Sequence, residues 1–290
     1  MSSDTAPPFG VRSMVAPLRW VAVRRPSLRG DYAAAHWAEP VDREILLEQH
    51  AAFVALLEKL DCRVEVLPAV DDMPDACFTY DPVFVTGAGA IELRSAKACR
   101  AGEPPLLAAQ LHGLGLPIVA RLQAPATADG GDMFWLDPET LAVGRSYRTN
   151  QAAIDQLRPV LAEEGVTVEV FDLPHDQGPD FCLHLMSVVS PVRDDLAVVY
   201  PRLAPVPLLL ELRRRGIELV EVPEEDYASL GCNVLTVAPG VAVIAQGNTA
   251  TVALLRNRGV MVHEYEAREI NKGEGGPTCL TRPIFRSEDL

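Results

Sequence analysis

The sequence predicts an α/β protein built from five related units, each with the order strand, strand, helix, strand. The leading strands of four units begin at residues 82, 133, 185 and 233, so the units repeat every 48 to 52 residues. Such a period is typical of repeat architectures. The two ends of the chain each supply part of a unit, and together they can make the fifth. Five units can close on themselves around a central channel with the helices outside, whereas the alternative is an open α/β sheet with coincidental spacing.

The N-terminal part of the chain supplies a strand, a helix and a second strand. Residues 18–23 and 62–67 have the length and apolar content of strands. Between them, apolar side chains recur near helical spacing over residues 41–60, which predicts a helix. Asp42 and Glu44 lie in its first turn, where the helix dipole favours acidic side chains.

Four complete units follow in the same order. The first has predicted strands at 82–86, 90–93 and 117–120 and a helix at 104–112. The second has strands at 133–136, 141–143 and 166–170 and a helix at 151–163, which Asn150 can cap. The third has strands at 185–189, 196–199 and 218–222 and a helix at 205–215. The fourth has strands at 233–237, 242–245 and 261–263 and a helix at 249–258.

Composition and charge narrow the class of protein. The chain has 290 residues, of which 48% are hydrophobic and 23% charged, an ordinary balance for one globular domain over residues 1–290. A net charge of −14 argues against nucleic acid and anionic membranes as partners, since both require a basic face. No apolar run is long enough to span a bilayer, and the first residues do not resemble a signal peptide. We expect residues 1–12 to be flexible and leave open whether the protein forms a homodimer.

The cysteines are scattered and none forms a Cys-x-x-Cys pair: they are Cys62, Cys77, Cys99, Cys182, Cys232 and Cys279. A structural zinc site is therefore not expected. Because a chain of this length can build a large core without a disulfide framework, we expect free thiols in a reducing cytoplasm. We also expect no catalytic metal and no organic cofactor.

Cys279 differs from the other cysteines because it ends a glycine-rich loop, residues 273–279, just before an apolar run. Glycines permit positive φ angles and close approach to a ligand, so this thiol can point into a pocket. The alternative is a small buried hydrophobic residue beside a surface turn. Only a thiolate is a strong nucleophile, so neighbouring groups must lower the thiol pKa or supply a base.

Polar residues occupy the same place in successive units, just before the leading strand. These segments are 74–81, 129–132, 182–185 and 231–233. If the units are related by rotation, the side chains that meet Cys279 near the central axis are Asp75, Asp81, Asp129 and His184. Each of these residues also has an interpretation without a catalytic role. The aspartates are typical of turns and of the residue before a strand, and a histidine between two leucines is often a buried core residue.

The combination of these side chains favours chemistry on a guanidinium. Aspartates clustered without the spacing of metal ligands suit a planar cation that donates several N–H bonds to carboxylates. A cysteine beside the guanidinium carbon can attack it, and a histidine can protonate the departing amine and then activate water. A carboxylate next to the histidine orients the ring and favours imidazolium. The product of such a reaction is a urea, as in citrulline.

Five segments together resemble the guanidine-modifying superfamily, which contains arginine deiminases, dimethylarginine dimethylaminohydrolases and amidinotransferases. The segments are PDACFTYDP at 74–82, DGGD at 129–132, SYRTN at 146–150, LHL at 183–185 and GGPTC at 275–279. The resemblance runs over nearly the whole chain. It implies a five-bladed α/β propeller, the pentein fold, made of ββαβ repeats with pseudo-fivefold symmetry.

The resemblance also implies catalytic roles. Cys279 falls on the nucleophile of the superfamily, and His184 falls on its general acid and base. Asp129 falls where a carboxylate pairs with that histidine.

Further residues fall on substrate-binding positions. Asp81 falls on the carboxylate that grips the guanidinium, and Asp75 falls on a nearby aspartate of the active site. Arg100 and Arg148 fall where the dimethylarginine enzymes bind the substrate carboxylate. The resemblance also suggests that the segment 11–30 closes the pocket.

The choice of substrate rests on smaller features. The length and the lack of a large helical insertion resemble the dimethylarginine enzymes, whereas GGPTC and FTYDP are closer to the deiminases. Met186 occupies a position where deiminases have an aspartate and dimethylarginine enzymes usually have a lysine. Tyr80 replaces an acidic residue that often precedes the guanidinium-binding aspartate, which is Asp81 here. The loss of one carboxylate suits a guanidinium with blocked nitrogens.

We therefore predict a cysteine-dependent hydrolase that converts Nω,Nω-dimethylarginine to citrulline and dimethylamine through a covalent thiouronium intermediate. The alternatives are an arginine deiminase, an amidinotransferase and, as a minor one, a propeller that binds a ligand without catalysis.

Overall fold

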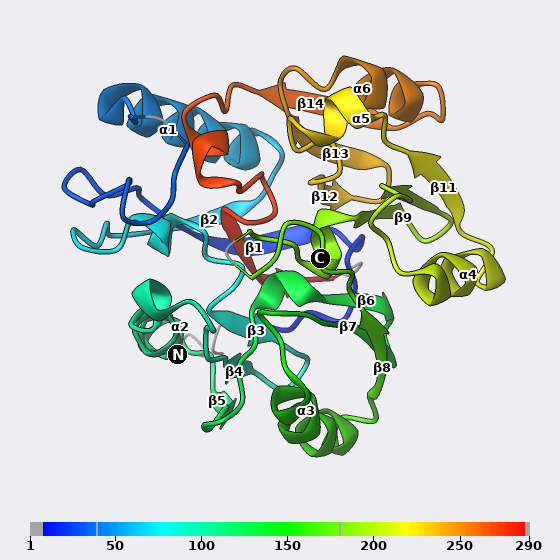
Figure 1. Ribbon diagram of the computed structural model, residues 1–290, viewed down its shortest axis with the longest axis horizontal. Helices are drawn as coiled ribbons and strands as arrows, with labels where there is room; N and C mark the ends of the chain where they lie inside the picture. Colours follow the sequence, from blue (N-terminus) through cyan, green and yellow to red (C-terminus); the bar gives the residue numbers. More distant parts are fainter. Residues whose placement is uncertain (1–7, 39, 180, 288–290) are drawn as a thin grey trace, which may run out of the picture.

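The computed structural model describes residues 8–38, 40–179 and 181–287. The strands in these residues form five sheets of three strands each (Figure 1). In every sheet the central strand is antiparallel to one neighbour and parallel to the other, and a helix makes the parallel connection. The prediction of an α/β fold made of ββαβ units is confirmed.

The four complete units have the predicted element order. The first contains β3 (Val83–Val85), β4 (Ala90–Glu92), α2 (Glu103–Gly113) and β5 (Ile118–Arg121). The second contains β6 (Met133–Asp137), β7 (Thr140–Arg145), α3 (Gln151–Glu163) and β8 (Thr167–Asp172). The third contains β9 (Val189–Arg193), β10 (Leu196–Val199), α4 (Val206–Arg214) and β11 (Glu218–Glu221). The fourth contains β12 (Leu235–Ala238), β13 (Val241–Ala245), α6 (Thr249–Arg256) and β14 (Met261–Tyr265).

The fifth sheet joins the two ends of the chain. β15 (Thr281–Arg286) pairs antiparallel with β1 (Leu18–Arg24), and β1 pairs parallel with β2 (Arg63–Leu67) through α1 (Arg43–Lys59). The N-terminal and C-terminal pieces therefore share one unit, as predicted. Cys279 lies just before β15, so its position depends on pairing with a strand from the opposite end of the chain.

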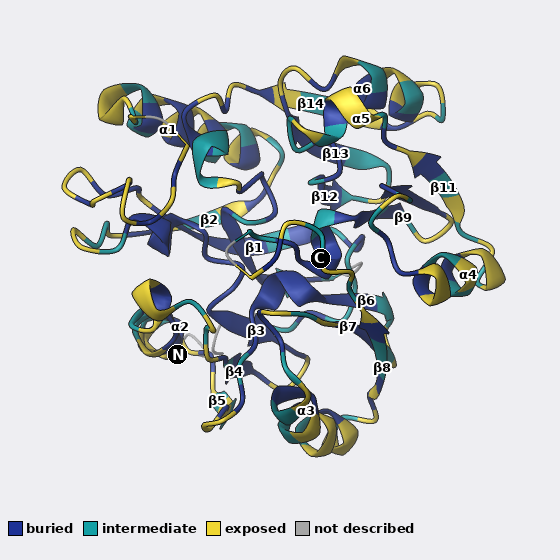
Figure 2. Ribbon diagram, in the orientation of Figure 1, coloured by how far each residue is buried: buried dark blue, intermediate teal, exposed yellow. Residues whose placement is uncertain are grey.

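The helices lie at the rim of the molecule, and the sheets lie between them and the centre (Figure 1). The strands near the centre are buried, whereas the outer faces of the helices are exposed (Figure 2). Apolar side chains such as Phe84, Phe134 and Val243 on these strands are at most 1% exposed. None of the helices in the described ranges has both the length and the apolar character needed to cross a membrane.

Two helices begin where capping side chains set their first turn. The side chain of Asp42 accepts from the backbone N–H of Glu44 and of Ile45, each at 3.1 Å, and α1 begins at the next residue. Asn150 Oδ1 accepts from the N–H of Ala153 at 3.0 Å and starts α3. Such caps satisfy backbone donors that have no partner within the helix.

The predicted strand at 185–189 is wrong. Residues Leu185–Ser187 form a 3₁₀ helix, η4, and the strand β9 starts at Val189. The N–H of Leu185 donates to Asp132 Oδ1 at 2.9 Å, which ties the segment to another unit instead of a neighbouring strand. The short helix α5 (Glu224–Tyr227) is also absent from the sequence-based assignment.

The N-terminal segment is bound to the protein from Gly10 onward. The N–H of Gly10 donates to the carbonyl oxygen of Ile284 at 2.8 Å, and Arg12 Nη2 pairs with Glu164 Oε2 at 2.9 Å. Of the residues 1–12 that we expected to be flexible, 1–7 lie outside the described residues.

Candidate active site

The polar segments before the leading strands share a local structure. Three of them form 3₁₀ helices: η1 (Pro74–Cys77) before β3, η3 (Gly130–Asp132) before β6, and η4 before β9. They contribute to a cavity of about 460 Å³. The predicted site residues in its wall are Cys279, His184, Asp81, Asp75, Arg100 and Arg148. Asp129 is not in the wall but lies behind His184.

Cys279 is partly exposed in this cavity. The side-chain amide of Asn233 donates to its Sγ at 3.1 Å. Burial and the charge of Asp81 raise the pKa of the Cys279 thiol to about 11, although Asn233, the N–H of Gly276 and His184 act in the opposite direction. The thiol is therefore neutral at pH 7 while the cavity holds no cation.

The glycine-rich loop before Cys279 is tightly packed. A Cβ atom on Gly275 would lie 2.2 Å from Cε1 of Phe78, and one on Gly276 would lie 2.5 Å from Cγ of Asn233. Of the two properties that glycine permits, positive φ is not used by these glycines, because the left-handed residue of the loop is Glu274, with φ 58°. The glycines are required for close approach, which brings the loop against the side chains that line the cavity.

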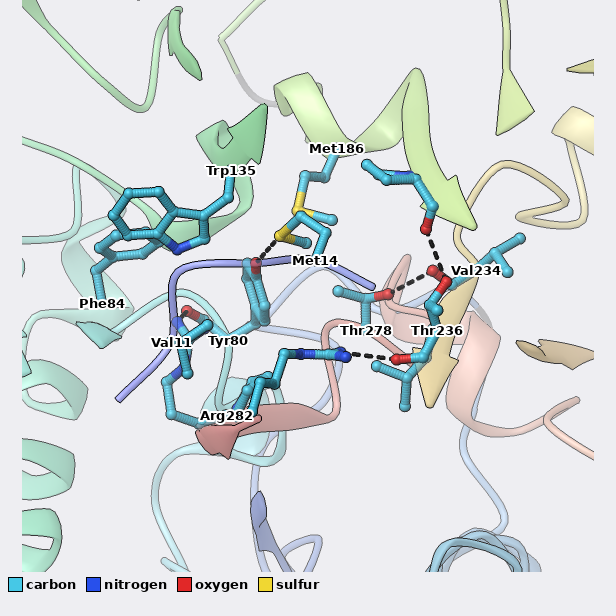
Figure 3. Close-up of a pocket in the computed structure, with 14 residues that line it drawn as sticks. Val11, Met14, Tyr80, Phe84, Trp135, Met186, Val234, Thr236, Thr278 and Arg282 are labelled. Carbon is cyan, nitrogen blue, oxygen red and sulfur yellow. Dashed lines mark hydrogen bonds between the residues drawn. The ribbon is translucent and has the colours of Figure 1, made fainter. Parts of the chain in front are cut away.

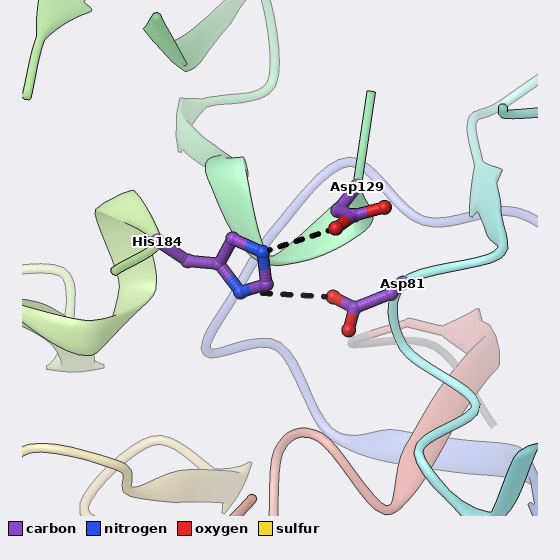
Figure 4. A group of neighbouring side chains, drawn as sticks. All are labelled: Asp81, Asp129 and His184. Atoms are coloured by element: carbon purple, nitrogen blue, oxygen red, sulfur yellow. Dashed lines mark hydrogen bonds and ion pairs between the residues drawn. The ribbon is translucent and has the colours of Figure 1, made fainter. Parts of the chain in front are cut away.

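His184 lies between two carboxylates (Figure 4). Its Nε2 is 3.4 Å from Asp129 Oδ2, and its Nδ1 is 3.9 Å from Asp81 Oδ1. Burial alone would lower the pKa of His184, but Cys182, Asp81 and Asp129 raise it well above its ordinary value. The ring is therefore an imidazolium at neutral pH and can give a proton to a departing amine.

The Asp-Gly-Gly-Asp segment positions this histidine. A Cβ atom on Gly131 would lie 2.4 Å from Nδ1 of His184, so the ring fits only against glycine. Asp132 is fully buried. Its Oδ2 accepts a hydrogen bond from Ser146 Oγ at 2.7 Å, and its Oδ1 accepts one from the N–H of Leu185. Burial raises the pKa of Asp132 to about 6. The second aspartate of the segment thus fixes the backbone next to His184.

Asp81 is held ionised at the cavity wall. Arg100 Nη1 donates to its Oδ2 at 2.6 Å, and the N–H of Gly131 donates to its Oδ1 at 3.0 Å. Burial would raise the pKa of Asp81, but His184, Arg100 and Gly131 lower it to about 2. A carboxylate that stays charged in a buried wall is suited to bind a cation.

Asp75 lies at the same wall and already has two partners. Trp37 Nε1 donates to its Oδ1 at 2.8 Å, and Lys97 Nζ donates to its Oδ2 at 2.9 Å. Residues near Trp37 also contribute, since Ala35 and His36 line the cavity. None of the residues 11–30 lines this cavity, and residues 18–24 of the segment form β1. That the segment 11–30 closes the pocket stays a prediction.

The two predicted arginines differ in their bonding. Arg100 donates to both oxygens of Glu103 at 2.8 to 3.1 Å, to Asp81 and to the carbonyl oxygen of Phe78. Arg148, by contrast, makes a single ion pair within the described residues, from Nη1 to Asp129 Oδ2 at 3.7 Å. Arg148 is thus the better placed to bind a substrate anion, whereas Arg100 holds Asp81.

Most of the chain is similar in sequence to known proteins. A model of the arginine deiminase family matches residues 64–210 and 204–286. The chain belongs to the arginine deiminase family. It is 30% identical over 241 residues to the uncharacterized protein YkgA of Bacillus subtilis (strain 168), which covers 83% of this chain and 80% of that protein.

Named enzymes of the superfamily are more distant. The chain is 26% identical to the dimethylarginine dimethylaminohydrolase of Pseudomonas aeruginosa, over 88% of this chain and 94% of that enzyme. It is also 26% identical to the arginine deiminase of Listeria welshimeri, over 75% of this chain and 63% of that enzyme. The chain thus spans less than two thirds of the length of the deiminase.

Solved structures have the same fold. A mutant of the Pseudomonas aeruginosa dimethylarginine enzyme in complex with citrulline matches with a TM-score of 0.78 and 23% identity, over 93% of this chain and all of that one. SxtG, an amidinotransferase from Microseira wollei, matches with a TM-score of 0.79 and 16% identity, over 98% and 99% of the two chains. These structures show the fold, and together with the family match they place the chain in the pentein superfamily.

Two residues at the family site escaped the sequence-based prediction of roles. Asn233 contacts Cys279, and it lies in the fourth of the repeated polar segments, so its position in the repeat was the available signal. Cys182 Sγ lies 3.6 Å from His184 Nδ1, but no sequence pattern distinguishes this cysteine from the others.

The side chains around His184 include a group of three possible metal ligands. One ligand atom from each of Asp81, Asp129 and His184 lies within 4.8 Å of the others, close enough to hold an ion. A metal requires neutral imidazole, whereas the raised pKa of His184 keeps its ring protonated. The three residues therefore suit proton transfer better than metal binding.

Proposed function

We propose that the chain hydrolyses the guanidinium group of a free arginine derivative, with Nω,Nω-dimethylarginine as the first candidate and citrulline and dimethylamine as products. The observation that carries the proposal is one cavity in which a thiol, an imidazolium and an ionised carboxylate occur together: Cys279, His184 and Asp81. We further propose that the five sheets are the blades of a propeller with pseudo-fivefold symmetry, whose axis passes through this site.

The first half of the reaction forms a covalent adduct. A guanidinium bound against Asp81 brings a positive charge to the cavity, which lowers the pKa of the Cys279 thiol and releases its proton to solvent. The thiolate attacks the guanidinium carbon and forms a C–S bond. His184 then donates its proton to the nitrogen of the leaving amine, the C–N bond breaks, and the S-alkylthiouronium remains on Cys279.

The second half hydrolyses the adduct. His184, now neutral and oriented by Asp129, takes a proton from water, and the hydroxyl attacks the same carbon. The C–S bond then breaks and the proton of the attacking hydroxyl passes to solvent, so the neutral urea leaves and the thiolate is regenerated. Asp129 and Asp81 stabilise the imidazolium at both stages because each lies within 4 Å of a ring nitrogen.

Dimethylarginine is favoured over arginine by the lining of the cavity. Phe78, Tyr80 and Met186 are in its wall, and Tyr80 and Met186 stand where superfamily members often have charged side chains. Methyl groups on one nitrogen suit apolar neighbours, whereas an unmodified guanidinium would leave N–H donors facing them. The coverage of 94% of the Pseudomonas aeruginosa dimethylarginine enzyme also supports this choice.

Arginine deiminase activity is the second candidate, because the matching family model is that of the arginine deiminases. Amidino transfer shares the covalent step and differs only in the acceptor of the second half. In the proposed scheme this acceptor is water.

The test is citrulline formation from dimethylarginine and from arginine in parallel, with Cys279→Ser as the control. Citrulline from dimethylarginine alone, lost in the variant, is the expected result. Citrulline mainly from arginine would establish the deiminase instead. Turnover only when a primary amine is added would establish a transferase. Absence of any product and of any adduct on Cys279 would contradict the proposal.

A further inference from the structure

Two arginines of β15 lie in the interior of the protein. Arg282 is 1% exposed and Arg286 is 8% exposed. Arg282 Nη1 donates to the carbonyl oxygens of Tyr80 at 3.0 Å and Val83 at 2.6 Å. Arg286 donates to the carbonyl oxygens of Ala16 and Thr236, each at 2.7 Å. Among the residues that the structure describes, neither guanidinium forms an ion pair with a carboxylate.

The charges of these arginines are not balanced by protein groups. Burial lowers the pKa of both guanidiniums, that of Arg286 to about 10. Because the guanidinium of arginine is not deprotonated in proteins, both side chains carry a positive charge. Asp81 is near enough to favour the charge on Arg282, but it already accepts from Arg100 at 2.6 Å. Tyr80 faces Arg282 with its ring, 4.1 Å from the guanidinium carbon, and its phenol is neutral because burial raises the pKa of Tyr80. Buried cations without a counter-charge are strongly disfavoured.

A small cavity lies against both arginines (Figure 3). Its volume is about 10 Å³, which is room for one particle of the size of a water molecule. Two donors on its lining residues are buried without a hydrogen-bond partner in the described residues: Nε of Arg282 and Nε1 of Trp135. No carboxylate is in its wall. The wall therefore offers positive charge and N–H donors.

We infer that this cavity binds one small monovalent anion, of the size class of chloride, between Arg282 and Arg286. Such an ion accepts hydrogen bonds only and supplies the missing negative charge. Sulfate and phosphate are too large for the cavity. A water molecule fits, but it leaves both charges unbalanced. The inference does not depend on the proposed function, although Tyr80, Met186 and Thr278 line both this cavity and the active site.

Halide substitution tests the site directly in the unmodified protein. Crystals soaked in sodium bromide are expected to show a bromine anomalous peak within hydrogen-bond distance of Arg282 or Arg286. A peak at surface positions alone, with a water molecule or nothing in the cavity, overturns the inference.

Stability in solution gives a second and independent test. Because an anion that binds only the folded state raises its stability, Tm should rise and saturate with sodium chloride, by roughly 5 °C, relative to sodium gluconate at equal ionic strength. The rise should be lost in Arg282→Met and kept in Arg213→Met, whose arginine is exposed. Trp135→Phe removes only one donor and should weaken the chloride response if Arg282→Met does not fold. Equal Tm values of the wild type in the two salts would contradict the inference.

Discussion

The amide of Asn233 connects the Cys279 thiol to the loop that carries it: Nδ2 donates to Cys279 Sγ at 3.1 Å, while Oδ1 accepts from the N–H of Thr278 at 3.1 Å. One side chain thus fixes the orientation of the thiol and stabilises its charged form. The amide cannot titrate, so this support is independent of pH.

Asn233→Ala should make the thiol a weaker nucleophile. Loss of the donor raises the pKa of Cys279 above its value of about 11, so less thiolate is present at any lower pH. We expect the alkylation of Cys279 by iodoacetamide at pH 8 to slow roughly fivefold. This factor corresponds to the loss of about 1 kcal/mol, the net contribution of one hydrogen bond. The measurement is mass spectrometry of the Cys279 peptide over time. Asn257→Ala on the exposed surface is the control, and an equal effect there would point to general destabilisation.

Asp129→Asn should reduce turnover and shift its pH dependence. The carboxylate raises the pKa of His184, so its removal lowers that pKa and less imidazolium remains at high pH. We expect kcat to fall by about 10²–10⁴-fold and the loss of activity on the basic side to begin at lower pH. A pH profile of kcat measures both, with the exposed Asp194→Asn as the control. If kcat of Asp129→Asn falls at the same basic pH as kcat of the wild type, Asp129 does not act through His184.

A methyl group at position 131 should displace the general acid. The Cβ atom of Gly131→Ala would lie 2.4 Å from Nδ1 of His184, so the ring must move. We expect activity to fall at least about 100-fold, as for loss of a general acid, while the chain still folds. Gly113→Ala in α2 is the matched control, because a Cβ there meets nothing within 4 Å. Its activity should stay at the wild-type level, and full activity of Gly131→Ala would refute the assigned geometry.

Arg148 and Arg100 should respond differently to substitution by glutamine. Arg148→Gln removes a cation that the protein hardly uses, so KM should rise roughly 10–100-fold with little change in Tm. Arg100→Gln leaves Glu103 and Asp81 without their cation and should cost about 3 kcal/mol of unfolding free energy. Kinetics with a substrate that lacks the α-carboxylate provide the control. If Arg148→Gln raises KM equally for that substrate, it does not bind the carboxylate.

Most of the fold was accessible from the sequence because each unit repeats the same order of short elements at nearly constant spacing. The helix 151–163 was predicted with its cap, since Asn150 acts within four residues. The strand at 185–189 was placed too early because the contact that decides it, from Leu185 to Asp132, spans 53 residues. Local patterns contain no information about such a contact.

The candidate site was predictable to the extent that its residues occupy equivalent places in the repeat. Position alone brought His184, Asp81 and Cys279 to one cavity. It did not show that Arg100 is saturated by Glu103, nor that Lys97 neutralises Asp75, because both pairings depend on how 3₁₀ helix η2 (Ala98–Arg100) folds over the wall. Charged residues near a site can bind substrate or each other, and only the structure distinguishes these cases.

The pairing of β15 with β1 makes the surroundings of Cys279 depend on two distant parts of the sequence. Cys279 lies two residues before β15, and β15 pairs with β1, which is more than 250 residues away along the chain. A chain that lacks either strand cannot form this sheet, so it cannot hold the Cys279 thiol beside Asn233 as the folded protein does. Removal of β1 is therefore expected to disrupt the cavity around Cys279 even though no residue of β1 lines that cavity.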